Sequence, residues 1–383
     1  MDIIDVLPSH GLTKRVKKVS VVHGFAVDET NSNPYDAVTY IEASKNFTPA
    51  TVSSGQLIAD EWLATYPFNS IRVIGLQGGT VLGEIDSNDY TKFIDGSSVS
   101  EDVDVMIEIP PLYWKFSQTD VGYEVRWSSE QIDDTYKALA HSRGTILKGN
   151  LYIGAYEGYV LSSKLCSISD YTPASNLKYN NYITYAEAKG DGYQIQSYYA
   201  TMLLQILFVS MFKTLNAELI CTGRTNGTVV NSGSLNTNGL YYLPSSSSEG
   251  FKFMGIENLW GNKGTYIGGI YVSSSTEILI NDGTVSDKLY TAFPISIEGV
   301  FEDSAHYPTK VIGTTEGGFL SISSIVGTSS TYYCDRQRFT PSYPFFNFGS
   351  TTSNYTGIFN LDAYYGYNES SSGISSRLIY LAP

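Results

Sequence analysis

Three neighbouring acidic residues, Asp102, Asp104 and Glu108, are the first candidates for catalysis or metal binding. A pair of carboxyl groups can act as general acid and base, and carboxylate oxygens are ligands for hard cations. These residues lie at a polar joint and at the start of a strand-like stretch, where carboxylates usually face water. We therefore expect the three side chains to be solvated.

Histidine and cysteine show no catalytic or metal-binding pattern. The sequence contains no HExxH, GxSxG or P-loop motif. The four histidines are scattered: His10, His23, His141 and His306. The three cysteines also stand far apart, without a CxxC pair: Cys166, Cys221 and Cys334. We predict structural histidines, buried free thiols, no cofactor, no metal site and no enzymatic activity.

The C-terminal end has the composition of a binding surface. Tyr364, Tyr365, Tyr367 and Asn368 surround Gly366, and a serine run follows them. Tyrosine joins a large flat contact area to a hydroxyl while immobilising only two torsions, so surfaces that recognise many shapes favour Tyr, Ser, Gly and Asn. Three tyrosines at such a turn cannot all point inward. We therefore expect this group to bind a ligand.

The overall composition excludes several classes of protein. The 383 residues include 31 tyrosines, carry a net charge of −14, and are only 16% charged. A nucleic-acid-binding protein needs clustered Lys and Arg, and the single basic cluster at residues 14–18 is too short to oppose this charge. The first residues lack the regions of a signal peptide, so we expect synthesis and folding in a cytosol.

Short apolar stretches alternate with turn residues, which is typical of strands. Residues 1–100 predict a small β-rich region, and the polar stretch 95–102 predicts a joint after it. Pro110 and Pro111 mark an edge or a bend, because proline cannot donate a hydrogen bond to a neighbouring strand. Further strands are expected at residues 105–109, 112–116, 123–127, 151–156 and 377–381.

Two helices are expected. Thr184 and Glu187 have capping-box spacing, which predicts a short helix ending before Gly190. Apolar residues recur at three- and four-residue steps over residues 197–216, which predicts a longer helix with a core-facing stripe. The longest apolar run, residues 202–212, is shorter than the ~20 residues of a bilayer span, so we expect no membrane insertion. Residues 222–250 are rich in Gly, Asn, Ser and Thr and predict surface loops.

Several stretches, taken in order, resemble the C-terminal domain of bacteriophage tail-fibre and receptor-binding proteins. Variable proteins of diversity-generating retroelements belong to the same group. The resemblance implies an α+β class, with a C-type-lectin-like fold of the formylglycine-generating-enzyme variety at residues 101–383 and a small β-rich attachment or assembly region at residues 1–100. It rests on residues 105–110, 153–158, 186–192, 255–262 and 373–378, together with the Leu-rich helix.

This chain departs from the group at positions that the group uses for catalysis and for binding sugar through calcium. The enzymes bind copper with a cysteine pair near the terminal strand, whereas Ser375, Ser376 and their neighbours include no cysteine. The Glu-Pro-Asn type of triplet that binds sugar through calcium is also missing. Catalysis of the first kind is therefore not expected, and any glycan binding would be free of metal.

The resemblance implies that the terminal strand anchors beside the start of the domain, while the loops before it are exposed. Retroelement diversification, where it occurs, produces residue types such as those found there. Four phenylalanines could equally fill the core between strands: Phe339, Phe345, Phe346 and Phe348. The candidate ligand-binding residues are Arg336, Arg338, Phe339, Tyr343, Phe345, Phe346, Thr352, Asn354, Tyr355, Tyr364, Tyr365, Tyr367 and Asn368.

The expected function is adhesion of a phage tail to a bacterial surface protein or glycan. The protein would be made in the host cytoplasm, reside in the virion and contact other tail proteins. A homotrimer is expected only by analogy with fibres. Two alternatives stay open: a structural tail or baseplate component without receptor contact, and a carbohydrate-active enzyme at the tail tip, which would need a carboxylate pair in a cleft.

Overall fold

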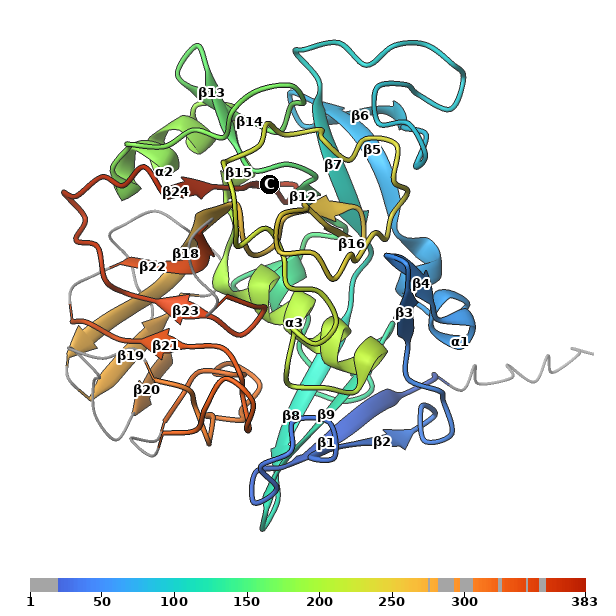
Figure 1. Cartoon of the computed structure of the whole chain (residues 1–383), viewed down its shortest axis with the longest axis vertical. Helices are drawn as coiled ribbons and strands as arrows, with labels where there is room; N and C mark the ends of the chain where they lie inside the picture. The colour runs from blue at the N-terminus through green and yellow to red at the C-terminus, as the bar shows by residue number, and fades with distance from the viewer. Residues whose placement is uncertain are drawn as a thin grey trace, which may run out of the picture.

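The computed structural model describes residues 20–274, 276–281, 306–322, 326–341 and 356–383, together with the backbone of residues 293–296 and 344–350. The described chain is built mainly from antiparallel sheets around one buried helix (Figure 1). Strands make up 34% of the structure and helices 11%. The expectation of an α+β class is therefore wrong. The physical reason is that most apolar stretches are short and flanked by turn residues, which favours strands over helices.

Three α-helices occur in the described residues. They are α1 (Asp60–Leu63), α2 (Tyr179–Glu187) and α3 (Tyr198–Phe212). None of the described helices has both the length and the apolar character to cross a bilayer. The short predicted helix is confirmed as α2, but it begins earlier than Thr184, because the Asn181 side chain accepts a hydrogen bond from the Lys178 backbone N–H at 3.1 Å and closes the first turn there.

A four-stranded sheet and a six-stranded sheet combine strands from both sides of residue 100. The first has the order β2-β1-β9-β8, with β1 (His23–Asp28), β2 (Val38–Glu42), β8 (Tyr113–Gln118) and β9 (Gly122–Ser128). The second has the order β15-β25-β12-β7-β5-β6, with β5 (Arg72–Gln77), β6 (Thr80–Glu84), β7 (Asp104–Ile109), β12 (Leu151–Gly154), β15 (Tyr193–Ile195) and β25 (Leu378–Tyr380). One packed core therefore extends across the expected boundary, and a separate role for residues 1–100 stays a prediction.

The six-stranded sheet confirms the predicted strand near the C-terminus. Strand β25 lies between β15 and β12, and Tyr380 pairs with both Tyr193 and Tyr152. The Arg377 side chain just before it is completely buried and donates hydrogen bonds to the backbone carbonyls of Gly154 at 2.9 Å and Glu257 at 2.6 Å. Residues 377–381 are therefore fixed inside the molecule.

A third sheet carries most of the C-terminal region. Its described strands are β18 (Lys263–Ser274), β19 (Glu277–Ile280), β20 (Phe293–Ser296), β21 (Gln337–Arg338), β22 (Pro344–Ser350), β23 (Leu361–Asp362) and β24 (Ile374–Ser376). Four small hairpins complete the described strands. They are β3 (Thr51–Ser53) with β4 (Gln56–Ile58), β10 (Ser142–Arg143) with β11 (Ile146–Leu147), β13 (Tyr159–Leu161) with β14 (Lys164–Cys166), and β16 (Lys252–Phe253) with β17 (Ile256–Glu257).

Helix α3 is the core on which the sheets pack (Figure 1). Every residue of the helix is buried, so the helix contacts the core on all its faces and not only along the predicted stripe. Ser197 caps the first turn by accepting a hydrogen bond from Ala200 N–H at 3.2 Å, and Lys213 ends the helix in a left-handed conformation. Several of its polar side chains are hydrogen-bonded within the core; the Gln205 side-chain N–H, for example, donates to the Ile358 carbonyl at 2.9 Å.

Two smaller predictions are also confirmed. Residues 222–250, all of which the structure describes, contain no helix or strand. Pro110 and Pro111 separate β7 from β8, which belong to different sheets, so the two prolines mark the bend at which the chain changes sheet.

Candidate functional site

The candidate site is a small platform at the end of the third sheet, built by Arg338, Asp362 and Tyr364. Strands β21 and β23 pair in parallel, with Arg338 opposite Asp362. The Arg338 guanidinium donates two hydrogen bonds to the Asp362 carboxylate, at 2.9 and 2.7 Å. Two parallel bonds of this kind fix the plane of the guanidinium.

The same guanidinium holds the Tyr364 ring. Its central carbon lies 4.0 Å from the centre of that ring, which is within the range of a cation–π interaction. The ring of Tyr365 meets it edge to face at 5.1 Å. Tyr364 nevertheless keeps 49% of its surface exposed. An aromatic ring is therefore presented to solvent in one orientation by an ion pair beneath it, of which Asp362 is buried and Arg338 is half-buried.

The other tyrosines of this group point partly inward. Tyr365 and Tyr367 are half-buried and pack against a core cluster that includes α2. The Tyr367 ring lies 5.4 Å from that of Tyr179 on α2 and 6.3 Å from that of Tyr271 on β18. Between them and the serine run, Asn368 is exposed. Of the predicted group, Tyr364 and Asn368 thus face solvent most fully.

The remaining predicted residues differ in their surroundings, and the backbone of Phe346 on β22 pairs with Asp362 of the platform. Phe339 is completely buried, so the core interpretation is correct for this residue. Arg336 is half-buried, one position before the buried Gln337. For Phe345 and Phe346 the structure describes only the backbone of β22, which pairs with β18. Outside the described residues lie Tyr343, Thr352, Asn354 and Tyr355.

Buried polar residues that the sequence analysis missed hold the platform in place. The Gln337 side chain donates to the carbonyls of Phe319 at 2.9 Å and Phe359 at 3.0 Å. Asp335 accepts a hydrogen bond from the Phe359 N–H at 2.9 Å and is completely buried. Half-buried Arg336 and Arg338 alternate with buried residues. Arginine at every second position is a sequence signal that could have predicted a strand with its arginines on the outer face.

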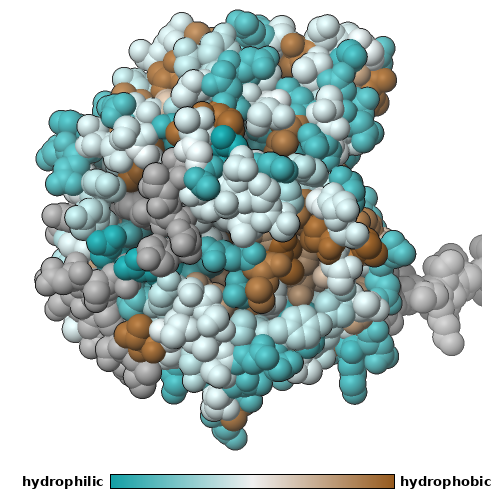
Figure 2. Space-filling view, in the orientation of Figure 1, coloured by the Kyte–Doolittle hydropathy of each residue, from teal (hydrophilic) through white to brown (hydrophobic). Residues whose placement is uncertain are grey.

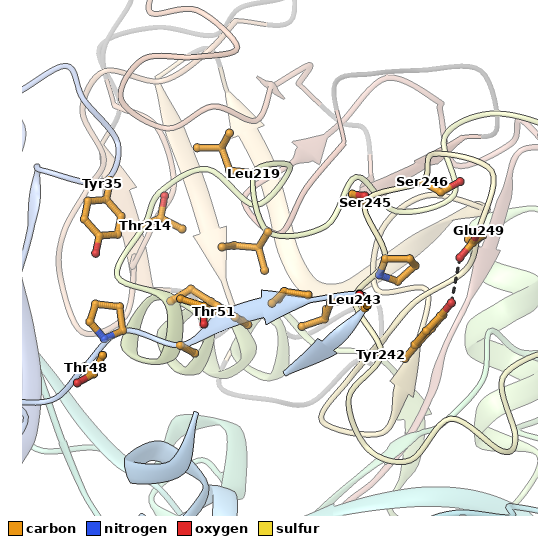
Figure 3. Close-up of a pocket in the computed structure, with 18 residues that line it drawn as sticks. Tyr35, Thr48, Thr51, Thr214, Leu219, Tyr242, Leu243, Ser245, Ser246 and Glu249 are labelled. Carbon is orange, nitrogen blue, oxygen red and sulfur yellow. Dashed lines mark hydrogen bonds between the residues drawn. The ribbon is translucent and has the colours of Figure 1, made fainter. Parts of the chain in front are cut away.

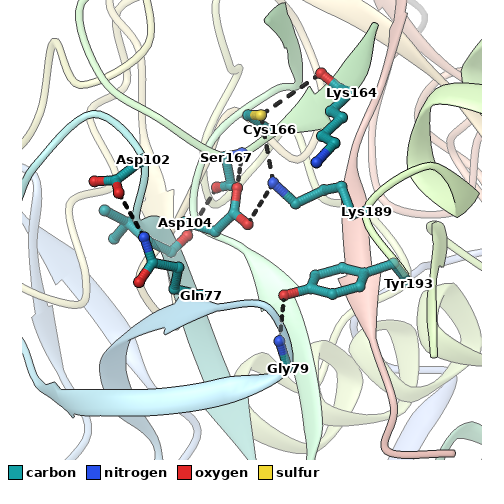
Figure 4. Close-up of polar contacts among 10 residues, drawn as sticks. Gln77, Gly79, Asp102, Asp104, Lys164, Cys166, Ser167, Lys189 and Tyr193 are labelled. Carbon is teal, nitrogen blue, oxygen red and sulfur yellow. Dashed lines mark hydrogen bonds and ion pairs between the residues drawn. The ribbon is translucent and has the colours of Figure 1, made fainter. Parts of the chain in front are cut away.

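The carboxylates at residues 102–108 do not form a catalytic pair, and the expectation that all three are solvated is wrong for two of them. Asp104 is 1% exposed and forms an ion pair with Lys189 at 2.7 Å, while its other oxygen accepts the Ser167 N–H at 2.8 Å (Figure 4). Burial raises the pKa of Asp104, and Lys189 opposes that rise. Only Asp102 remains at the surface, where it accepts a hydrogen bond from Gln77.

Glu108 is also buried, at 4% exposure. It pairs with Arg72 and accepts hydrogen bonds from Asn150 at 2.6 Å and from the Tyr152 hydroxyl at 3.1 Å. Because every one of these partners comes from another strand or loop, Glu108 joins segments of the six-stranded sheet. Both buried carboxylates therefore serve the fold.

The described residues give little support for metal-binding or thiol chemistry. Among the described residues, no group of three His, Cys, Asp or Glu side chains could hold a metal ion. The three cysteines are free and buried, as predicted. Lys189 lies 3.4 Å from the Cys166 sulfur (Figure 4), but burial, the largest effect, raises the pKa of this thiol and makes it a poor nucleophile.

No protein-family model matches the chain, and a search of curated proteins finds no match either. The resemblance to phage receptor-binding proteins therefore stays a prediction.

Proposed function

We propose that this chain is a receptor-binding protein of a bacteriophage tail and that the Tyr364 platform contacts the bacterial surface. The proposal joins the sequence resemblance to one observation: the Tyr364 ring is half-exposed and is held in place by the Arg338–Asp362 pair. A rigid aromatic anchor loses little entropy on binding, and such anchors carry a large share of the affinity of many interfaces.

The neighbourhood of the ring suits adhesion. Asn368 supplies an exposed amide, and Glu369 accepts a hydrogen bond from Gly366 N–H at 3.2 Å, which closes the turn on which Tyr367 and Asn368 lie. The receptor is a bacterial surface protein or glycan. Several copies of the chain on one virion, with a trimer as the expected unit, would raise the avidity about a hundredfold or more without any new contact.

The test is a Tyr364→Ala variant, with Tyr364→Phe and Ile94→Ala as controls. Ile94 is 69% exposed and lies outside the platform. Loss of an aromatic anchor worth ~2 kcal/mol should weaken binding of the purified, labelled chain to host cells by about tenfold or more. The Phe variant keeps the ring and should retain most of the binding.

Three measurements accompany the cell-binding assay: thermal unfolding, the yield of assembled virions, and release of sugar from host-wall polysaccharide. If Tyr364→Ala and the wild type bind cells equally well, the proposal that the platform contacts the receptor is wrong. A loss of assembled virions with unchanged cell binding would favour the structural alternative. Turnover of wall polysaccharide by the purified chain would favour the enzyme.

A further inference from the structure

A groove of about 660 Å³ lies beside the β3–β4 hairpin, formed by residues other than those of the Tyr364 platform. Its walls are the hairpin, the end of α3 with the loop that follows, and residues 242–249. Figure 2 shows apolar residues gathered around a hollow on this face. This volume is within the usual range for sites that bind small ligands.

The groove is preformed by backbone contacts. The Leu243 N–H donates to the Gly55 carbonyl at 2.7 Å, and the Ala50 N–H donates to the Met211 carbonyl at 2.8 Å, so both sides of the hairpin are tied to the core. Gly55 has a φ of +79°, and a Cβ added there would lie 2.9 Å from the Tyr242 ring. The absence of a side chain at Gly55 therefore lets the Tyr242 ring lie against the hairpin turn.

Two tyrosines lie at opposite ends of the groove (Figure 3). Tyr35 is 43% exposed. The Tyr242 hydroxyl donates a hydrogen bond to Glu249 at 3.0 Å, which fixes both side chains. Between the two rings the floor is apolar and the rim carries hydroxyl groups. The floor includes Val52, Phe212 and Leu243, and the rim includes Thr48, Thr51 and Ser245.

The charge of the groove restricts its ligand. Glu249 is the one charged residue among those that line it. The nearby Lys213 ammonium lies over the Tyr35 ring at 4.4 Å from its centre. Because the protein also carries a net charge of −14, phosphates, sulfates and carboxylates would be repelled. Since Glu249 lies in the lining and Lys213 lies outside it, the groove favours an uncharged or cationic ligand over an anionic one.

We propose that this groove binds a neutral oligosaccharide. A sugar ring has an apolar face of C–H groups, which packs on aromatic rings and an apolar floor, and a rim of hydroxyls. Those hydroxyls match the threonine and serine hydroxyls and the Glu249 carboxylate, which is a strong acceptor. A purely apolar ligand would leave these polar groups without partners. The site is separate from the proposed receptor platform and goes beyond it.

The experiment measures binding of neutral trisaccharides to the full chain by isothermal titration calorimetry. The probes are maltotriose, cellotriose and triacetylchitotriose, with trigalacturonic acid as the anionic counterpart. At least one neutral probe should bind with a Kd of about 1 mM or tighter. Tyr242→Ala should weaken that binding by about tenfold or more, as expected for an aromatic anchor. Tyr364→Ala should leave it unchanged, and melting temperatures check that each variant is folded.

Glu249→Gln separates charge from shape. This variant should bind trigalacturonic acid better than the wild type does, because the repulsion is removed while the size of the side chain is kept. Failure of all three neutral probes, or equal affinity of wild type and Tyr242→Ala, would overturn the proposal. So would sedimentation data in which Tyr242→Ala disperses a wild-type oligomer, since the groove would then be an interface between copies.

Discussion

Asp335 should make the stability of this protein fall as pH rises. The carboxyl group is completely buried, one of its oxygens has no hydrogen-bond partner among the residues that the structure describes, and a Cβ on Gly357 would overlap it. Burial raises the pKa of Asp335 from 3.8 to about 8, and the Glu218 carboxylate adds to the rise, while the Phe359 N–H opposes it. The protonated form is therefore favoured in the folded protein.

The direction in which stability changes with pH follows from the pKa values of Asp335 in the unfolded and the folded chain. In the unfolded chain Asp335 loses its proton near pH 3.8, whereas in the folded chain it keeps the proton up to about pH 8. The stabilising effect is fully present below the lower pKa and is lost as pH rises through the higher one. At ~1.4 kcal/mol for each pKa unit, the loss between about pH 5 and about pH 8.5 is on the order of 4 kcal/mol.

Urea unfolding of wild type and Asp335→Asn at these two pH values tests the prediction. The variant lacks the titrating proton, so the difference in unfolding free energy between the two proteins removes the contribution of carboxyls that do not interact with Asp335, such as Glu29 and Glu157, whose pKa values burial also raises. As pH rises between these two values, the unfolding free energy of the variant relative to that of the wild type should increase by about 4 kcal/mol. A difference that stays constant with pH would show that Asp335 is ionised in the folded protein.

Three further predictions concern stability and adhesion. Arg377→Lys should lower the unfolding free energy by ~3 kcal/mol in urea unfolding, because one ammonium cannot reach the carbonyls that the buried guanidinium bonds; a loss below ~1 kcal/mol would contradict this role. Lys189→Met should cost ~3 kcal/mol by leaving Asp104 buried and unpaired, and adding Asp104→Asn should recover most of the loss; additive losses would refute the coupling. Adhesion to host cells should change less than about threefold between low and moderate salt, because the two charges of the platform, Arg338 and Asp362, neutralise each other; a steeper fall would mean that charge dominates binding.

Elements set by local pattern could be predicted from the sequence. Helix α3 and strand β25 could be predicted because each contains a run of apolar residues that has to be buried. The class was predicted wrongly, because the resemblance suggested more helix than these short, turn-rich stretches form. The burial of Asp104 could not be predicted either, since it depends on Lys189, which is distant in sequence and arrives only through the fold.

The candidate site was predicted in part. The tyrosine group was found from composition, but which ring faces solvent depends on distant partners: Tyr179 covers Tyr367, while Arg338 supports Tyr364 from below. Composition carries no information about such pairings. The role of Asp362 in the platform could not be predicted for the same reason, because the sequence around an acidic residue does not show which arginine it pairs with.

The interior position of β25 has a consequence for biosynthesis. Its neighbours β12 and β15 are translated long before residues 378–380 emerge from the ribosome, so the nascent chain holds two open strand edges until then. A product cut short before residue 378 would keep those edges and could pair with a second truncated chain. Premature termination should therefore yield insoluble aggregates rather than a shortened protein that still folds.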